Sequence, residues 1–254
     1  MCASISPDGD WLTFMSMGKQ FDIFVMRADG TGRRQLTDDL HRDYWPRWSP
    51  DGREIYFYSN RSGSMEIWII HPDGSGMRQL TDTPGRNLGN PAWSPDGMRM
   101  SYFDYTRCIS YIFDPKKPWE EQTPLALLPL SDEGMCFHAF SWSPDGHWLA
   151  GRDHFGSILF GEIVIYSLET ERFRSLHPIG WRDLWLHDSR GLLFVSEAGA
   201  LHKVDIDSGK SSEVLSLVPD MIFPTDFSPD HKWLYFTHMR WEADIWMLTL
   251  SEPR

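Results

Sequence analysis

The pentapeptide Trp-Ser-Pro-Asp-Gly occurs three times in the chain, at residues 48–52, 93–97 and 142–146. Looser copies occupy residues 5–9 (ISPDG), 187–191 (HDSRG) and 227–231 (FSPDH), so the chain contains six units. Counted from the second residue of each copy, successive units are 43, 45, 49, 45 and 40 residues apart. A period of this length indicates a repeat architecture in which each unit is one supersecondary element that packs on its neighbours.

The second unit, residues 46–81, shows most clearly what one repeat folds into. Pro50 presets φ for the second position of a type I turn, and Gly52 accepts the positive φ that follows. Residues 54–58 and 65–70 are rich in β-branched and aromatic side chains, and residues 71–76 contain an Asp-Gly hairpin signal before the final stretch 77–81. With the strand that leads into the turn, each unit is predicted to form four antiparallel strands.

The same reading applies to the whole chain, because no segment has long helical periodicity. We expect an all-β fold: a six-bladed β-propeller of four-stranded antiparallel blades, forming a single domain over residues 1–254. The last blade is expected to be incomplete, because residues 251–254 are too short and polar to add a strand after residues 244–250. The chain is accordingly interpreted as an excised or C-terminal piece of a longer protein, a monomer or a weak dimer through that edge.

The repeated motifs resemble the TolB-type propeller repeat, an aromatic residue and SPDG followed by a strand, an Ile-aromatic strand, Asp-Gly and Arg-x-Leu-Thr. The match is close over residues 6–37 and 49–81 and partial in the other four units. The resemblance implies a bacterial, non-enzymatic protein-binding scaffold, since TolB itself is a periplasmic partner in the Tol-Pal system. It also implies a role in signalling or peptide processing as an alternative, because related repeats are fused to kinases, transcription regulators and peptidases. A periplasmic location is therefore favoured, although the chain contains no signal peptide.

Charge and composition restrict the partners. The chain has 36 acidic and 24 basic side chains, a formal charge of −12, which disfavours binding to the phosphate backbone of nucleic acids. No apolar run is long enough to span a bilayer, so no membrane insertion is expected. The three cysteines, Cys2, Cys108 and Cys136, are scattered and odd in number, which predicts neither a disulfide framework nor a zinc site. We expect no cofactor and no metal.

Catalytic signatures are missing from the sequence. It contains no G-x-S-x-G, H-E-x-x-H or G-x-x-x-x-G-K-[ST] motif, and DGSG at residues 73–76 is interpreted as a tight connector between strands. The aromatic residues before the turns are predicted to pack between neighbouring blades. They are Trp48, Trp93 and Trp142, with Ile5, His187 and Phe227 in the same register.

Function is expected where the repeats differ, on the loops before the first strand and between the second and third strands of each unit. These loops are rich in arginine, histidine and aromatic residues, which favour recognition of a protein or peptide segment that carries carboxylates. We name this predicted binding surface the variable rim; it comprises Arg42, Asp43, Tyr44, Arg61, Asn87, Arg107, His138, Arg152, His154, Arg182, Asp183, His238, Arg240 and Trp241. The same loops also contain His41, Asn60, Arg86, Asn90 and Trp181.

Two enzymatic alternatives remain open on the sequence. The propeller could gate a hydrolase domain such as a peptidase. It could also be a lyase that uses histidines, arginines and a metal at the mouth of the propeller's central channel, which the variable loops form, with His41, His138, His154 and His238 converging there.

Overall fold

The computed structural model describes residues 3–17, 20–127, 136–153, 161–217, 220–239 and 243–249. It divides into two compact units. The first contains Met1–Arg107, Tyr111–Leu125 and Phe227–Asp230, and the second contains Cys108–Ser110, Ala126–Asp226 and His231–Arg254. The fold is all-β, as predicted, and it is built from antiparallel hairpins.

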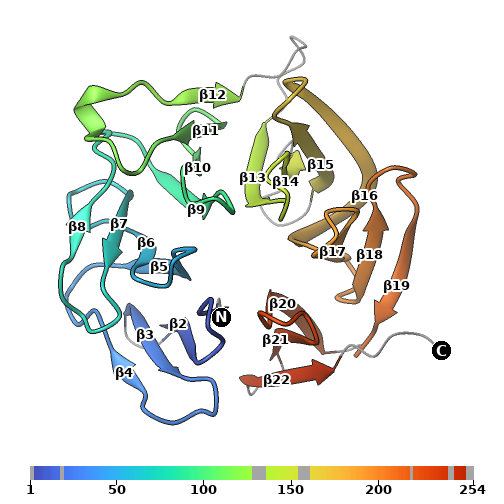
Figure 1. Ribbon diagram of the computed structural model, residues 1–254, viewed down its shortest axis with the longest axis horizontal. Coiled ribbons are helices and arrows are strands. Elements are labelled where there is room, and N and C mark those ends of the chain that lie inside the picture. The colour runs from blue at the N-terminus through green and yellow to red at the C-terminus, as the bar shows by residue number, and fades with distance from the viewer. Residues whose placement is uncertain are drawn as a thin grey trace. The chain divides into compact units, whose positions relative to one another are not determined.

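Three four-stranded sheets are formed by the first half of the chain, and each corresponds to one sequence unit (Figure 1). The first contains β1 (Ala3–Ile5), β2 (Trp11–Met17), β3 (Phe21–Arg27) and β4 (Arg34–Gln35). The second contains β5 (Asp43–Trp48), β6 (Ile55–Ser59), β7 (Glu66–Ile70) and β8 (Arg78–Gln79). The third contains β9 (Leu88–Trp93), β10 (Met100–Asp104), β11 (Ile109–Phe113) and β12 (Leu125–Leu127), with the short 3-10 helix η1 (Trp119–Glu121) between β11 and β12.

The second half of the chain differs from the prediction of separate blades. The strands β13 (Phe137–Trp142), β14 (Trp148–Asp153), β15 (Gly161–Ser167), β16 (Arg172–Trp185), β17 (Gly191–Val195), β18 (Leu201–Asp205) and β19 (Ser211–Leu215) form one seven-stranded sheet. The reason is that β16 continues without a break from one hairpin into the next (Figure 1). This strand is 14 residues long. Its first part pairs with β15 and its last part with β17, so two sequence units share it instead of being separated by a loop.

A three-stranded sheet completes the described part of the chain. It contains β20 (Met221–Phe227), β21 (Trp233–Met239) and β22 (Ala243–Thr249). Within the described residues, this last sequence unit therefore supplies three strands.

The SPDG turns have the conformation that the sequence predicts. Gly52 has a φ of 69°, and its amide donates a hydrogen bond to the Ser49 carbonyl. The Ser49 hydroxyl donates to the Asp51 carboxylate at 2.6 Å and accepts from the amide of Glu54 at 3.0 Å. One serine thus joins both ends of the turn, which explains why serine and aspartate recur together at this spacing.

The register of the fifth turn was predicted incorrectly. The amide of Ser189, with a φ of 57°, donates to the Leu186 carbonyl, as Gly52 does to Ser49. The turn is therefore residues 186–189, two positions before the register assumed from HDSRG. The residue that corresponds to Trp48 is Trp185, whereas His187 is exposed and stacks on His231 at 5.1 Å.

The predicted packing of the turn tryptophans is confirmed for Trp48. It is buried in a cluster that includes Ile23 and Val25 of the first sheet and Ile55 and Phe57 of the second. Trp185, which lies in the second of the two compact units, is also buried. Its cluster contains residues from the strands β14 to β18 of the seven-stranded sheet. The first and second sheets therefore share an apolar core, which is how repeat folds bury surface that one repeat cannot bury alone.

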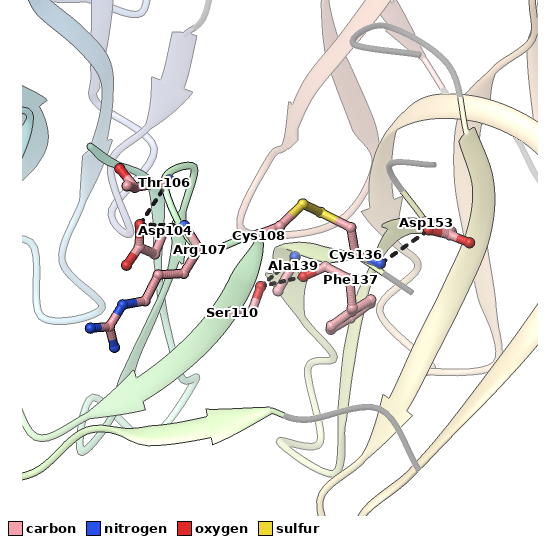
Figure 2. Close-up of a disulfide and its surroundings, with 9 residues drawn as sticks. All are labelled: Asp104, Thr106, Arg107, Cys108, Ser110, Cys136, Phe137, Ala139 and Asp153. Atoms are coloured by element: carbon pink, nitrogen blue, oxygen red, sulfur yellow. Dashed lines mark hydrogen bonds between the residues drawn. A yellow bond between two sulfur atoms is a disulfide. The ribbon is translucent and has the colours of Figure 1, made fainter. Parts of the chain in front are cut away.

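The cysteine prediction needs a correction. Cys108 and Cys136 form a disulfide, with their Cα atoms 5.3 Å apart (Figure 2). The two residues are 28 positions apart in the chain, and no local spacing rule connects them. The tertiary fold brings Cys108 beside Cys136, the residue that precedes β13.

Candidate functional site

Arg61 organises the part of the variable rim that lies in the second sheet. Its guanidinium donates to both carboxylate oxygens of Asp43 at 2.9 Å and to Asp39 at 3.1 Å. The Asp43 side chain has no exposed surface, and that of Arg61 is only 10% exposed. The guanidinium also lies over the rings of Phe57 and Trp68. Arg61 is therefore part of a buried ion-pair network in the first compact unit.

The neighbouring rim residues are more accessible. Arg42 is exposed, and its backbone amide is held by the Asn60 side chain at 2.8 Å. Tyr44 is half-buried between Phe21 and Tyr58, with ring centroids 4.8 and 5.3 Å away. His41 is half-buried, and its amide donates to Asp39.

Acidic side chains surround this network. The pKa of Asp22 is raised, first by burial and then by the negative charges of Asp43, Asp38 and Asp39. Arg61 thus offsets part of a local excess of carboxylates, which limits how far it can attract an acidic partner.

A bulge of strained backbone recurs beside the rim. Trp45, Asn90 and Arg182 have φ values of 55°, 49° and 57°, each three residues before the tryptophan that leads into a turn. The pairing register shifts next to Trp45 and Arg182. Bulges re-aim the side chains of a strand, and positive φ is uncommon for residues other than glycine. Sequence reasoning missed this feature, because the three residues share no side-chain chemistry.

In the third sheet, the buried carboxylate of Asp104 fixes the rim turn. One of its oxygens accepts hydrogen bonds from the amides of Thr106 at 2.9 Å and Arg107 at 3.2 Å (Figure 2). The other lies 3.6 Å from the Arg86 guanidinium. Arg107 itself is exposed. A rigid turn therefore presents this cation at the surface.

Two asparagines connect the same turn to the loop before β9. Asn87 is exposed, and its amide donates to the Thr106 hydroxyl at 3.0 Å while its carbonyl accepts from Tyr105. Asn90 is buried, and its side chain donates to the Tyr105 hydroxyl at 2.8 Å.

The described rim residues of the second compact unit, residues 108–110, 126–226 and 231–254, are largely buried. His138 and Arg152 are cross-strand neighbours in β13 and β14, 1% and 7% exposed. Both contact Phe140: the histidine ring stacks on it at 4.3 Å, and the guanidinium lies 5.0 Å from its centroid. These two side chains support the sheet as well as the rim.

The remaining described rim residues are also held by neighbours. Asp183 is buried and accepts a hydrogen bond from Ser141 at 2.9 Å. Arg182 lies 5.1 Å over the ring of Trp181 and the same distance over that of Phe223. The buried ring of His238 is 2.9 Å from Asp220. His154, Arg240 and Trp241 lie outside the described residues.

A separate groove in the first unit was not predicted. Its volume is about 950 Å³, and it lies at the end of the sheets where the SPDG turns are, opposite the variable rim. The turns at Asp51 and Asp96 form two walls, and Trp93, Lys116 and Trp119 form part of the rest. The sequence feature that could have indicated it is the spacing of 49 residues between the third and fourth repeats, which reflects the additional segment around η1.

Neither a metal centre nor a membrane span is found in the part of the chain that the structure describes. Among those residues, no three His, Cys, Asp or Glu side chains gather as a metal ion would require. None of their helices has the length and apolar character needed to cross a bilayer.

Comparison with known proteins relates the chain to one family. The family model described as the TolB beta propeller domain matches residues 1–146. Dipeptidyl-peptidase 5 of Porphyromonas gingivalis is 29% identical over 290 aligned residues, which cover 91% of this chain and 42% of that protein. The chain thus spans less than half the length of this curated relative.

Solved structures agree on the fold. A putative TolB from Agrobacterium tumefaciens superposes with a TM-score of 0.73 at 18% identity, covering 94% of this chain and 90% of the other. TolB from Acinetobacter baumannii gives a TM-score of 0.70 at 16% identity, covering 97% of this chain and 65% of the other. At these identities the likeness shows the fold alone. Since the family model matches more than half of the chain, the chain belongs to the TolB β-propeller family.

Proposed function

We propose that this chain is a binding module: a single six-bladed propeller over residues 1–254 that holds an extended, acidic segment of another protein at its variable rim. A location outside the cytoplasm accompanies this proposal, on the resemblance to TolB. The observation that carries it is the construction of the rim in the first unit. Buried carboxylates hold the loops, while Arg42 and Arg107 are exposed on them.

The physical argument concerns preorganisation. A loop that is already ordered loses little entropy when a ligand binds, so its contacts contribute more to affinity. Asp104 fixes the amide of Arg107, and Asn60 fixes that of Arg42. Exposed guanidinium groups on such loops recognise carboxylates by charge-assisted hydrogen bonds, with an affinity that decreases as salt is added.

The test measures binding of fluorescein-labelled decapeptide pools by anisotropy, one pool rich in Asp and Glu and one in which Asn and Gln replace them. We expect the acidic pool to bind and the amide pool to bind at least 10-fold more weakly. The double variant Arg42→Ala/Arg107→Ala should lose roughly 10-fold or more of the affinity for the acidic pool.

The matched control is Arg53→Ala. Arg53 is also a highly exposed arginine of the second sheet, but it follows the SPDG turn at the other end of the strands. Equal binding of both pools, or an Arg42→Ala/Arg107→Ala variant that binds as the wild type does, would refute the rim as the binding site.

A second candidate is a propeller that admits peptide substrates to a peptidase. The observation in its favour is the 29% identity to dipeptidyl-peptidase 5 across 91% of the chain. It is tested with the protein encoded by the full reading frame, assayed for release of dipeptides from chromogenic dipeptidyl anilides. In that case the Arg42→Ala/Arg107→Ala change should raise KM and leave kcat near its wild-type value, since the rim would contact only the substrate.

A further inference from the structure

The Cys108–Cys136 disulfide lies within the second unit, to which residues 108–110 belong (Figure 2). Cys108 is in the turn between β10 and β11, and Cys136 directly precedes β13. Cys136 is 5% exposed, and Cys108 is half-buried. The bond therefore crosslinks two segments that are distant in the chain, at the end of the strands where the variable rim lies.

Hydrogen bonds extend the crosslink along the same two segments. Ser110, in β11, donates to the Phe137 carbonyl at 2.8 Å and accepts from the Ala139 amide at 2.9 Å. The Cys136 amide donates to Asp153 at 3.3 Å. Figure 2 shows these contacts beside the sulfur atoms. The disulfide thus lies next to hydrogen bonds that join the same two segments of the chain.

The backbone at Cys108 needs such a constraint. Its φ is 61°, in the left-handed region that residues with a Cβ atom seldom adopt. A conformation of this kind persists only where its surroundings enforce it. Asp104 fixes the preceding amides of Thr106 and Arg107, and the disulfide fixes Cys108 itself.

We propose that the Cys108–Cys136 disulfide is a redox-controlled crosslink that fastens Cys108 to the start of β13, and that the protein is built to work in an oxidising compartment. Disulfides persist in such compartments and are kept reduced in the cytosol. This part of the proposal is independent of any binding function.

The chemistry is thiol–disulfide exchange with a small or protein disulfide as the oxidant. The thiolate of one cysteine attacks a sulfur of the oxidant, which releases one thiolate and leaves a mixed disulfide. The second cysteine, as its thiolate, attacks the protein sulfur of that mixed disulfide and releases the other thiolate. Two electrons and two protons pass from the cysteine pair to the oxidant, and a dithiol reductant reverses the exchange.

The crosslink also affects the variable rim, an effect that rests on the proposed function. Arg107 directly precedes Cys108, and His138 lies two residues after Cys136. Reduction frees the turn from its covalent constraint, so a ligand that needs Arg107 in place should bind the reduced protein more weakly.

The first experiment counts free thiols. The purified oxidised protein is unfolded in guanidinium chloride without reductant, alkylated with iodoacetamide and weighed by mass spectrometry, and the procedure is repeated after dithiothreitol. We expect one label, on Cys2, before reduction and three labels after it. Three labels before reduction would overturn the proposal.

The second experiment measures stability and local opening. In the wild type, dithiothreitol should raise the unfolding equilibrium constant by roughly 10²- to 10³-fold, as expected for a loop of this length. The Cys108→Ser/Cys136→Ser variant should match the reduced wild type and should not respond to dithiothreitol, whereas Cys2→Ser should behave as the wild type does. Amide exchange in residues 104–108 and 136–139 should accelerate on reduction. A urea midpoint and an exchange rate that reduction leaves unchanged would refute the crosslink.

Peptide binding separates the two proposals. If the thiol count and stability change as expected and the acidic pool binds neither form, the crosslink stands and the proposed function fails. If the acidic pool binds the oxidised and reduced forms equally, the effect of the crosslink on the rim is refuted.

Discussion

Replacing Arg61 with alanine is the sharpest test of how the rim of the second sheet is built. In the wild type, its guanidinium contacts both oxygens of Asp43, and the Asp43 side chain has no exposed surface. The Arg61→Ala change removes this partner and leaves a carboxylate without its countercharge in the interior. The loss is therefore the cost of a stranded buried charge, which exceeds the net contribution of the pair itself.

The magnitude follows from burial. Breaking a buried ion pair by removing one partner costs about 3–5 kcal/mol, whereas a pair between exposed groups contributes about 0–1 kcal/mol. For a chain of 254 residues, the buried case corresponds to a melting temperature lower by roughly 6–20 °C. Loss of the contacts with the Phe57 and Trp68 rings acts in the same direction.

Urea denaturation followed by tryptophan fluorescence gives the free energy of unfolding. Arg42→Ala is the matched control, because Arg42 is an exposed arginine of the same rim and should change stability by no more than about 0.5 kcal/mol. Adding Asp43→Leu to Arg61→Ala should recover part of the loss, since the stranded charge is then absent. If Arg61→Ala costs less than about 1 kcal/mol, or if the double variant is no more stable than the single one, the buried-pair argument is wrong.

Three other predictions concern the turns. Gly52→Val should destabilise the protein by about 1–2 kcal/mol, because φ is 69° there, and an unchanged thermal midpoint would contradict it. The pKa of Asp51 lies below its usual value, chiefly because of the Ser49 hydrogen bond. That bond therefore stabilises the folded protein when the pH is above the pKa of Asp51 in the unfolded chain. The stabilisation is lost as the pH falls through the pKa of Asp51 in the folded protein. Urea midpoints of wild type and Ser49→Ala should accordingly differ most at neutral pH, and the difference should narrow below about pH 4 to the part due to the Glu54 amide bond, whereas a pH-independent difference would argue against this origin. Trp185→Ala should cost roughly 3–5 kcal/mol and His187→Ala less than about 0.5 kcal/mol, and the reverse order would restore the rejected register of the fifth turn.

Local chemistry explains which features could be predicted. The Ser-Pro-Asp-Gly turn is determined within a few residues, because proline restricts φ, glycine accepts positive φ and serine hydrogen-bonds aspartate. The all-β fold and the four-stranded units follow from such turns and from the β-branched strands between them. The packing of Trp48 between sheets was predictable as well, since a large apolar side chain at one position in every repeat needs a neighbouring unit to cover it.

The fifth unit shows where local signals failed. Leu186 and Ser189 occupy the turn positions that serine and glycine have elsewhere, so the visible glycine at position 191 suggested the wrong register. Hydrogen bonds across the turn identify the alignment, and the sequence letters alone do not. The continuous strand β16 could not be predicted either, because a β-strand and an extended loop have similar sequences.

Only the tertiary structure decided how distant polar residues pair. Cys108 and Cys136 are 28 residues apart, and Asp43 begins β5 whereas Arg61 follows β6, so no spacing rule could connect either pair. The sequence alone does not distinguish Arg42 from Arg61. Arg42 is exposed, whereas Arg61 is buried and paired with Asp43. The sequence determined the repeat and its turns, because these depend on interactions within a few residues. The structure decided which side chains of the variable rim face solvent, because burial depends on contacts between segments far apart in the chain.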